Sequence, residues 1–276
     1  MFGWLFKSKA ERVRAKAERA QERADRAQER EEKAQARKAQ AKAGVTQELL
    51  QATRNSSLGY MMEALKKGAD PNVVDPKSGD SVLNIALQNK HMDGALILIK
   101  AGANVSFFSG AGNSPLLLAT SLGNHMLPVV KAILNGGVKV VGHRKKGMPN
   151  AGATPLYLAA LVGADSVYNL LLKHGAGPGV TTDDGHSIMY AASAGGSVKI
   201  LRSLLRKRHD INEIIPNGYR PIHIAAMHGH VDAVMWFLEN DVSIEEKADG
   251  GATPLAIAAL YDQGYVVQLL ARRGAI

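Results

Sequence analysis

The sequence predicts an all-α protein, in which a solenoid of about seven helix–turn–helix repeats follows one long, charged N-terminal helix. Two observations predict the solenoid: short Ser/Thr-Pro-aliphatic elements recur at intervals of mostly 33 residues, and Gly-Ala elements suited to helix ends recur in the same register. A third predicts the helix, because residues 7–43 contain no Gly, Pro or aromatic residue and consist mainly of strong helix formers.

Composition excludes several classes of protein. The 276 residues include no cysteine, which rules out disulfide frameworks, thiolate zinc sites and cysteine nucleophiles. Hydrophobic residues make up 46% of the chain but aromatic residues only 5%, so aliphatic side chains and alanine must fill the core. No apolar run reaches the roughly 18 residues of a membrane-spanning helix, and residues 1–6 are too few for a signal-peptide core. We therefore expect a cytoplasmic protein.

The net charge of +9 is concentrated at the N-terminus. Residues 1–44 contain 13 Lys/Arg and 7 Asp/Glu, whereas residues 45–276 contain 21 and 18. Nucleic-acid binding by the basic helix is disfavoured, because acidic residues interleave with the bases and no aromatic residue stands among them to stack on bases.

The N-terminal helix is expected over residues 7–44, about 55 Å long at 1.5 Å per residue, with Gly44 as its stop. Two arrangements fit it. A heptad of mostly alanine allows weak self-association through residues 10–41 as a coiled coil, although Glu31 and Lys38 interrupt the seam. Alternatively, the helix is single and solvated, with i,i+4 pairs such as Glu22/Arg26 and Glu29/Lys33.

The first residues combine bulky apolar groups with cations, which is typical of an interfacial membrane anchor. Residues 1–16 are therefore expected to contact a membrane surface, with the protein peripheral on the inner membrane, or else to fold back over the end of the repeat stack. The sequence leaves secretion or delivery into a host open. The membrane candidates are Phe2, Trp4, Leu5, Phe6 and Lys7.

Each recurring residue of the repeat has a physical role in starting or ending a helix. A Ser or Thr at the N-cap accepts a hydrogen bond from a free amide of the first turn, and proline at the next position presets the helical dihedral. Glycine, such as Gly163 or Gly229, ends the first helix, and a second helix carries aliphatic residues at helical spacing. The elements begin at Ser81, Ser114, Thr154, Ser187, Arg220 and Thr253, and repeat ends fall at Gly68, Gly102, Gly136, Gly175, Arg208, Asp241 and Gly274.

This pattern resembles the ankyrin repeat family. It covers the repeats 46–75, 76–108, 109–141, 149–181, 182–214, 215–247 and 248–276. The first repeat lacks the Thr-Pro-Leu element, as a divergent end-cap would, the fifth lacks its proline, and the sixth has Arg220 in place of threonine. The resemblance implies stacked helix pairs with projecting loops, the fingers, and a concave groove that binds a partner protein.

Partner choice must depend on residues that the repeat leaves free. Phe107/Phe108 and Ile214/Ile215 are unusual, because two adjacent apolar residues on an extended finger cannot both point inward. Each pair either offers a binding hot spot or packs one member under the next finger. The candidates for partner binding are Phe107, Phe108, Arg144, Lys145, Lys146, Met148, Leu161, Val162, His186, Ile214, Tyr219, Met227, His228 and Tyr261.

One interval is 40 residues instead of 33, which places an insertion at residues 141–147. Insertions in solenoids form loops on one face, and this one carries Arg144, Lys145 and Lys146. It either contacts an acidic partner or lipid headgroups, or is a solvated loop without a role.

No motif indicates catalysis, a cofactor or a metal. His223, His228 and His230 occupy places where ankyrin repeats carry structural histidines, and phosphate loops, dinucleotide fingerprints and nucleophile elbows are missing. The sequence therefore predicts no enzyme but a scaffold or adaptor for a protein partner, with an inhibitor or a host-factor-binding protein among the options. The alternative is a membrane-surface protein tethered by its N-terminal helix.

Overall fold

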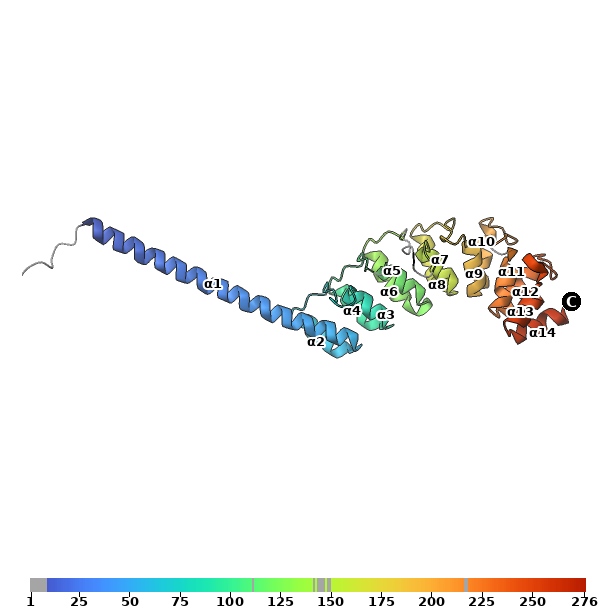
Figure 1. Ribbon diagram of the computed structural model, residues 1–276, viewed down its shortest axis with the longest axis horizontal. Helices are drawn as coiled ribbons and strands as arrows, with labels where there is room; N and C mark the ends of the chain where they lie inside the picture. The colour runs from blue at the N-terminus through green and yellow to red at the C-terminus, as the bar shows by residue number, and fades with distance from the viewer. Residues whose placement is uncertain (1–8, 111, 141, 143–146, 148–149, 216–217) are drawn as a thin grey trace, which may run out of the picture.

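The computed structural model describes residues 9–110, 112–140, 142, 147, 150–215 and 218–276. This part of the chain is helical, with one isolated antiparallel bridge between Val74 and Ser81. Figure 1 shows a long helix that projects from an elongated stack of short helices, with the C-terminus at the far end of the stack. The predicted all-α solenoid is confirmed.

The stack consists of seven helix pairs, as the sequence predicts. The pairs are α1 (Lys9–Arg54) with α2 (Leu58–Lys66), α3 (Val82–Gln88) with α4 (Met92–Lys100), α5 (Pro115–Ser121) with α6 (Leu127–Asn135), α7 (Pro155–Leu161) with α8 (Asp165–Lys173), α9 (Ile188–Gly195) with α10 (Val198–Arg206), α11 (Pro221–Met227) with α12 (Val231–Glu239), and α13 (Pro254–Leu260) with α14 (Gly264–Arg272). Two 3-10 turns, η1 (Asn124–Met126) and η3 (Asp249–Gly251), precede α6 and α13.

The predicted N-caps start five of the first helices. The hydroxyl oxygens of these residues accept from the amide three positions along, at 3.2 to 3.3 Å, and such a cap contributes about 1 kcal/mol. Where proline follows, it fills the first helical position without losing a hydrogen bond. The five caps are Ser81, Ser114, Thr154, Ser187 and Thr253.

The ends of the second helices follow the predicted register even where glycine is missing. Four of these positions, Gly68, Gly102, Gly175 and Gly274, are glycines with positive φ, whereas in the third repeat the left-handed residue is Gly137, one position after the predicted Gly136. Arg208 and Asp241 occupy the same register and also adopt positive φ, 64° and 62°. The left-handed conformation costs a residue other than glycine about 1–2 kcal/mol. The turn geometry of the repeat therefore overrides the local preference of these two residues.

The expected stop at Gly44 is wrong, because α1 continues to Arg54. A glycine within a helix costs only about 1 kcal/mol relative to alanine. Five and six residues further on, Leu49 and Leu50 are fully buried against the stack, and the Thr53 hydroxyl donates to the Leu49 carbonyl at 2.8 Å. Packing downstream of Gly44 therefore decides its conformation. The last turns of α1 are the first helix of the first repeat.

The exposed part of α1 carries i,i+4 contacts along its surface. The predicted Glu29–Lys33 ion pair is present at 2.5 Å, and Gln21 donates to Asp25 at 2.9 Å. Glu22 and Arg26 form no ion pair within the described helix. Self-association through residues 10–41 stays a prediction.

Consecutive first helices approach each other closely along the stack. Their paired alanines, such as Ala159/Ala160 and Ala191/Ala192, are completely buried. At the seam between α7 and α9 even one methyl group has no room, because a Cβ on Gly195 would lie 2.2 Å from the Ala160 carbonyl oxygen. Small residues thus set the spacing of the repeats.

Gly195→Ala should destabilise the protein by about 1–3 kcal/mol, since the added methyl meets backbone that cannot rotate away. Thermal and urea unfolding of the full chain measure this effect. Gly177→Ala is the matched control: its Cβ meets nothing within 4 Å and its φ is not positive, so stability should change little. Equal losses in the two variants would contradict this account of the seam.

The buried side chain of His223 links the first helix of the sixth repeat to the finger that leads to the seventh repeat. His223 Nδ1 accepts from the Arg220 amide at 3.1 Å, so Nε2 must carry the proton that is donated to the Glu246 carbonyl at 2.9 Å. Burial lowers the pKa of His223. Protonation at Nδ1 would remove its acceptor, so this contact requires the neutral ring.

Because the folded-state pKa of His223 is lowered, the unfolded chain binds the proton more tightly, and His223 removes stability as the pH falls below its ordinary pKa of about 6.5. We expect His223→Leu to lose about 1–3 kcal/mol at pH 7.5, because the Arg220 amide and the Glu246 carbonyl both lose their partner on the side chain. The difference from the unsubstituted chain should shrink toward pH 5. Urea titrations at several pH values measure it, and a pH-independent difference would contradict the assignment.

Candidate protein-binding surface

The fingers form one edge of the stack (Figure 1). Each finger joins the second helix of one repeat to the first helix of the next. Neighbouring fingers are linked by backbone contacts, as where the Asp183 amide donates to the Ala151 carbonyl at 2.9 Å. Side chains on the fingers are therefore held at defined positions.

The fingers present several of the predicted residues to solvent. Ile214 is 72% exposed while Ile215 is buried at 5%, so one member of this pair packs inward as the alternation requires. Phe108 is 44% exposed, and Phe107 is half-buried. Their binding role stays a prediction.

Two further finger candidates are held by aromatic contacts. The ring of His186 stacks on Tyr190 with a centroid distance of 4.1 Å. Tyr219 packs edge-on against His223 at 6.0 Å. Both side chains are half-buried, so each offers only part of its ring to a partner.

A second row of candidates lies at the opposite ends of the first helices. Val162, His228 and Tyr261 are the C-cap residues of α7, α11 and α13, and all three are exposed. Leu161 and Met227 precede two of them and are half-buried. The pKa of His228 is lowered by burial and by the neighbouring His230.

The structure does not bring these candidates into one cluster. A seven-residue first helix separates the finger row from the C-cap row, which amounts to about 10 Å at 1.5 Å per residue. The two rows run along the stack with one position per repeat. Such an arrangement suits an extended partner surface better than a small molecule.

Some predicted residues lie outside the described part of the chain. These are the membrane candidates Phe2, Trp4, Leu5, Phe6 and Lys7, the insertion residues Arg144, Lys145 and Lys146, and the finger candidate Met148. Contact of residues 1–16 with a membrane stays a prediction.

Two carboxylates at the base of the fingers were missed by sequence reasoning. Glu213 accepts a hydrogen bond from the Ser187 hydroxyl, and burial raises its pKa. One repeat later, Glu246 pairs with Arg220 at 2.5 Å. Residues 187 and 220 share one register position, as do 213 and 246, so superimposing the repeats would have shown the pair. These groups join repeats and are not free for ligands.

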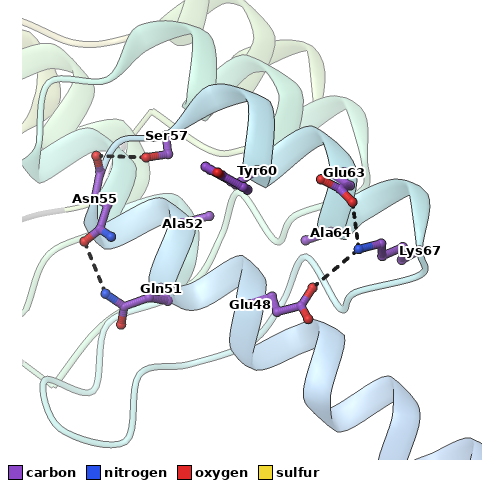
Figure 2. Close-up of a pocket in the computed structure, with 9 residues that line it drawn as sticks. All are labelled: Glu48, Gln51, Ala52, Asn55, Ser57, Tyr60, Glu63, Ala64 and Lys67. Carbon is purple, nitrogen blue, oxygen red and sulfur yellow. Dashed lines mark hydrogen bonds and ion pairs between the residues drawn. The ribbon is translucent and has the colours of Figure 1, made fainter.

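The N-terminal end of the stack has an open groove, in which charged and amide side chains border a mostly apolar surface. Figure 2 shows it between the end of α1 and α2, with Ala52 and Ala64 on its floor. Lys67 pairs with Glu63 at 2.8 Å and lies 3.9 Å from Glu48. These three charged groups pair with one another, and Tyr60 beside them is 71% exposed. The polar end-cap that the divergent first repeat suggests stays a prediction.

Within the described residues, no His, Asp and Glu side chains gather in the groups of three or more that hold a metal ion. None of the described helices combines the length and hydropathy that a membrane span requires.

Comparison with known families identifies the repeats. The family described as ankyrin repeats (3 copies) matches residues 188–276, and a single ankyrin repeat matches residues 151–183. The chain contains ankyrin repeats. The crystal structure of the human ASB11 ankyrin repeat domain is similar with a TM-score of 0.61 and 21% identity, over 83% of this chain and 98% of that domain. This likeness shows the ankyrin fold.

Curated ankyrin-repeat relatives are similar over shorter segments. The fowlpox virus ankyrin repeat protein FPV031 is 29% identical over 136 residues, which cover 48% of this chain and 38% of that protein. The Oryza sativa protein XBOS34, named a probable E3 ubiquitin-protein ligase, is 31% identical over 112 residues, covering 41% of this chain and 21% of that protein. The matched segments span well under half of each relative.

The two isoleucines of one ankyrin finger should separate binding from stability. Ile215→Ser should lose about 2–4 kcal/mol of unfolding free energy, because it removes a buried side chain and leaves a hydroxyl in its place. Ile214→Ser should leave stability within about 0.5 kcal/mol. Urea unfolding of the full chain measures both variants, and similar losses would show that the finger does not hold the two side chains as described.

Proposed function

We propose that the chain is a protein-binding scaffold or adaptor, which holds a partner protein across its finger row and C-cap row. Ankyrin repeats form a protein–protein interaction domain. The observation that carries the proposal is the set of apolar candidates left exposed in the two rows, among which Ile214, at 72%, is the most exposed. Exposed apolar groups on a rigid support lose little entropy on binding and make good hot spots.

The size of this surface supports a macromolecular partner. A standard protein–protein interface buries about 1,600 Å² in total, or about 800 Å² per partner. Two rows of side chains about 10 Å apart provide such an area when a few neighbouring repeats take part. An inhibitor or an adaptor for a host factor would use the surface in the same way.

Site-specific crosslinking can test the proposal. A photoactivatable residue is placed in the full chain at Ile214 or at Val162, one in each row, and irradiated in cells of the source organism. Both positions should capture the same protein. The matched control places the residue at Lys131, which is exposed on the second helix α6, where no such adduct should form.

Adducts that form as readily from Lys131 as from the two rows would contradict the proposed surface. If one protein forms adducts from Lys131 alone, the interface lies on the second helices and not on the two rows.

A membrane-surface role is the second candidate. It is favoured by the composition of residues 1–16 and by the way α1 projects from the stack (Figure 1). It also accommodates a peripheral location on the inner membrane surface.

A further inference from the structure

Charge is unevenly spread among the repeats themselves. From residue 94 to residue 164, between Asp93 and Asp165, the chain has no Asp or Glu but six Lys/Arg. The other residues of 45–276 contain 15 Lys/Arg and 18 Asp/Glu, so they carry a small negative charge. Residues 94–164, which run from within α4 to just beyond α7, therefore form an acid-free block of positive charge.

A recess opens between two fingers within this block. It has a volume of about 450 Å³ and lies where the finger before α5 faces the finger before α7. Its lining is mostly apolar, and Lys139 is the charged residue among the described side chains that line it. We call it the finger pocket; its lining residues are Val105, Ser106, Phe108, Ser114, Leu116, Gly137, Val138, Lys139, Gly142 and Pro155.

The longer repeat interval coincides with this pocket. The two first helices beside it, α5 and α7, start 40 residues apart instead of 33, and Gly142 of the insertion is part of the wall. A Cβ on Gly142 would lie 3.9 Å from the Phe108 ring, so the glycine borders the recess without filling it. The 44% exposed Phe108 thus keeps one side open to solvent.

We propose that the finger pocket takes an apolar side chain from an acidic segment of the partner protein, with Lys139 beside the carboxylates that flank this anchor. This inference rests on the proposed scaffold function and names the partner's chemistry. An apolar recess selects a large aliphatic or aromatic side chain. The acid-free block attracts negative charge from a distance and repels basic segments.

The recess favours a peptide over a lipid surface. A bilayer presents a broad, flat face of headgroups, which cannot enter a gap between two adjacent fingers. A peptide can insert one side chain while its backbone lies along the finger edge. The shape of the site therefore argues for a protein segment, whereas charge alone would fit both.

Peptide binding tests the inference with three matched libraries of 12-residue peptides. The first has a central Leu or Phe flanked by Asp, Glu, Ser and Gly, the second replaces Asp and Glu by Lys, and the third has a central Ala. The full chain at low salt should bind the first library about tenfold more tightly than either of the others, as fluorescence anisotropy measures. Binding should weaken as salt screens the charges.

Two pocket variants and two matched controls locate the site. Phe108→Ser and Lys139→Glu should each weaken binding of the first library about tenfold. Val180→Ser and Lys173→Glu make the same chemical changes at exposed positions outside the acid-free block and should leave binding unchanged. Thermal unfolding of each variant confirms that the fold is retained, and Lys139→Glu, at an exposed residue, remains informative if Phe108→Ser unfolds.

Three outcomes would overturn the inference: no preference for the first library, a preference that both pocket variants leave unchanged, or tighter pocket-dependent binding of vesicles containing anionic lipid than of the peptides. If Ile214 and Val162 still crosslink one partner in cells when Lys139→Glu is present, the scaffold function stands and the finger pocket alone is rejected. Loss of crosslinks from all positions of the unsubstituted chain would reject the scaffold function instead.

Discussion

The close approach of consecutive first helices is the constraint on which the rest of this structure depends. Each helix pair is too thin to bury its own apolar face, so adjacent repeats must share one layer of side chains. Alanine pairs and Gly195 let the backbones come near enough for that layer to close. The seam uses the same few positions in every repeat. The finger tips and the C-caps of the first helices therefore do not take part in the packing between first helices. They are the positions at which one ankyrin-repeat protein can differ from another without loss of fold.

Local chemistry made most of the fold predictable. A hydroxyl at an N-cap, a proline after it and a turn of fixed register act within a few residues, so the seven helix pairs could be located from sequence alone, including the left-handed turns at Arg208 and Asp241. Gly44 was misjudged because the burial of Leu49 and Leu50, not local preference, keeps α1 helical there. The Ser187–Glu213 contact joins the start of one first helix to the finger that leads to the next repeat, so it depends on the tertiary fold and not on local sequence. Exposure at the fingers was foreseen for Ile214, because a residue pair on an extended strand must divide between inside and outside.

The repeats differ in the chemistry that fastens their fingers. Toward the C-terminus, carboxylates take part, as in the Arg220–Glu246 pair. Toward the acid-free block, neutral amides do the same work: Asn72 Nδ2 donates to the Gly102 carbonyl at 3.2 Å, and Asn84 Nδ2 donates to the Asn113 carbonyl at 3.2 Å. These neutral hydrogen bonds stabilise the stack without adding carboxylates. The positive potential of the nearby basic residues is therefore not reduced by the groups that hold the fingers. Structure and charge can therefore vary independently from repeat to repeat.

The unbroken passage of α1 into the first repeat has a mechanical consequence. A flexible chain of the 36 residues from Lys9 to Gly44 would span about 33 Å on average and point in every direction. As a helix the same residues reach about 54 Å in one direction that the buried Leu49 and Leu50 determine. One residue more or less in that stretch would turn everything beyond it by about 100° around the helix axis. A molecule that contacts the N-terminal end of α1 therefore does so at a distance and angle from the repeats that the helix determines.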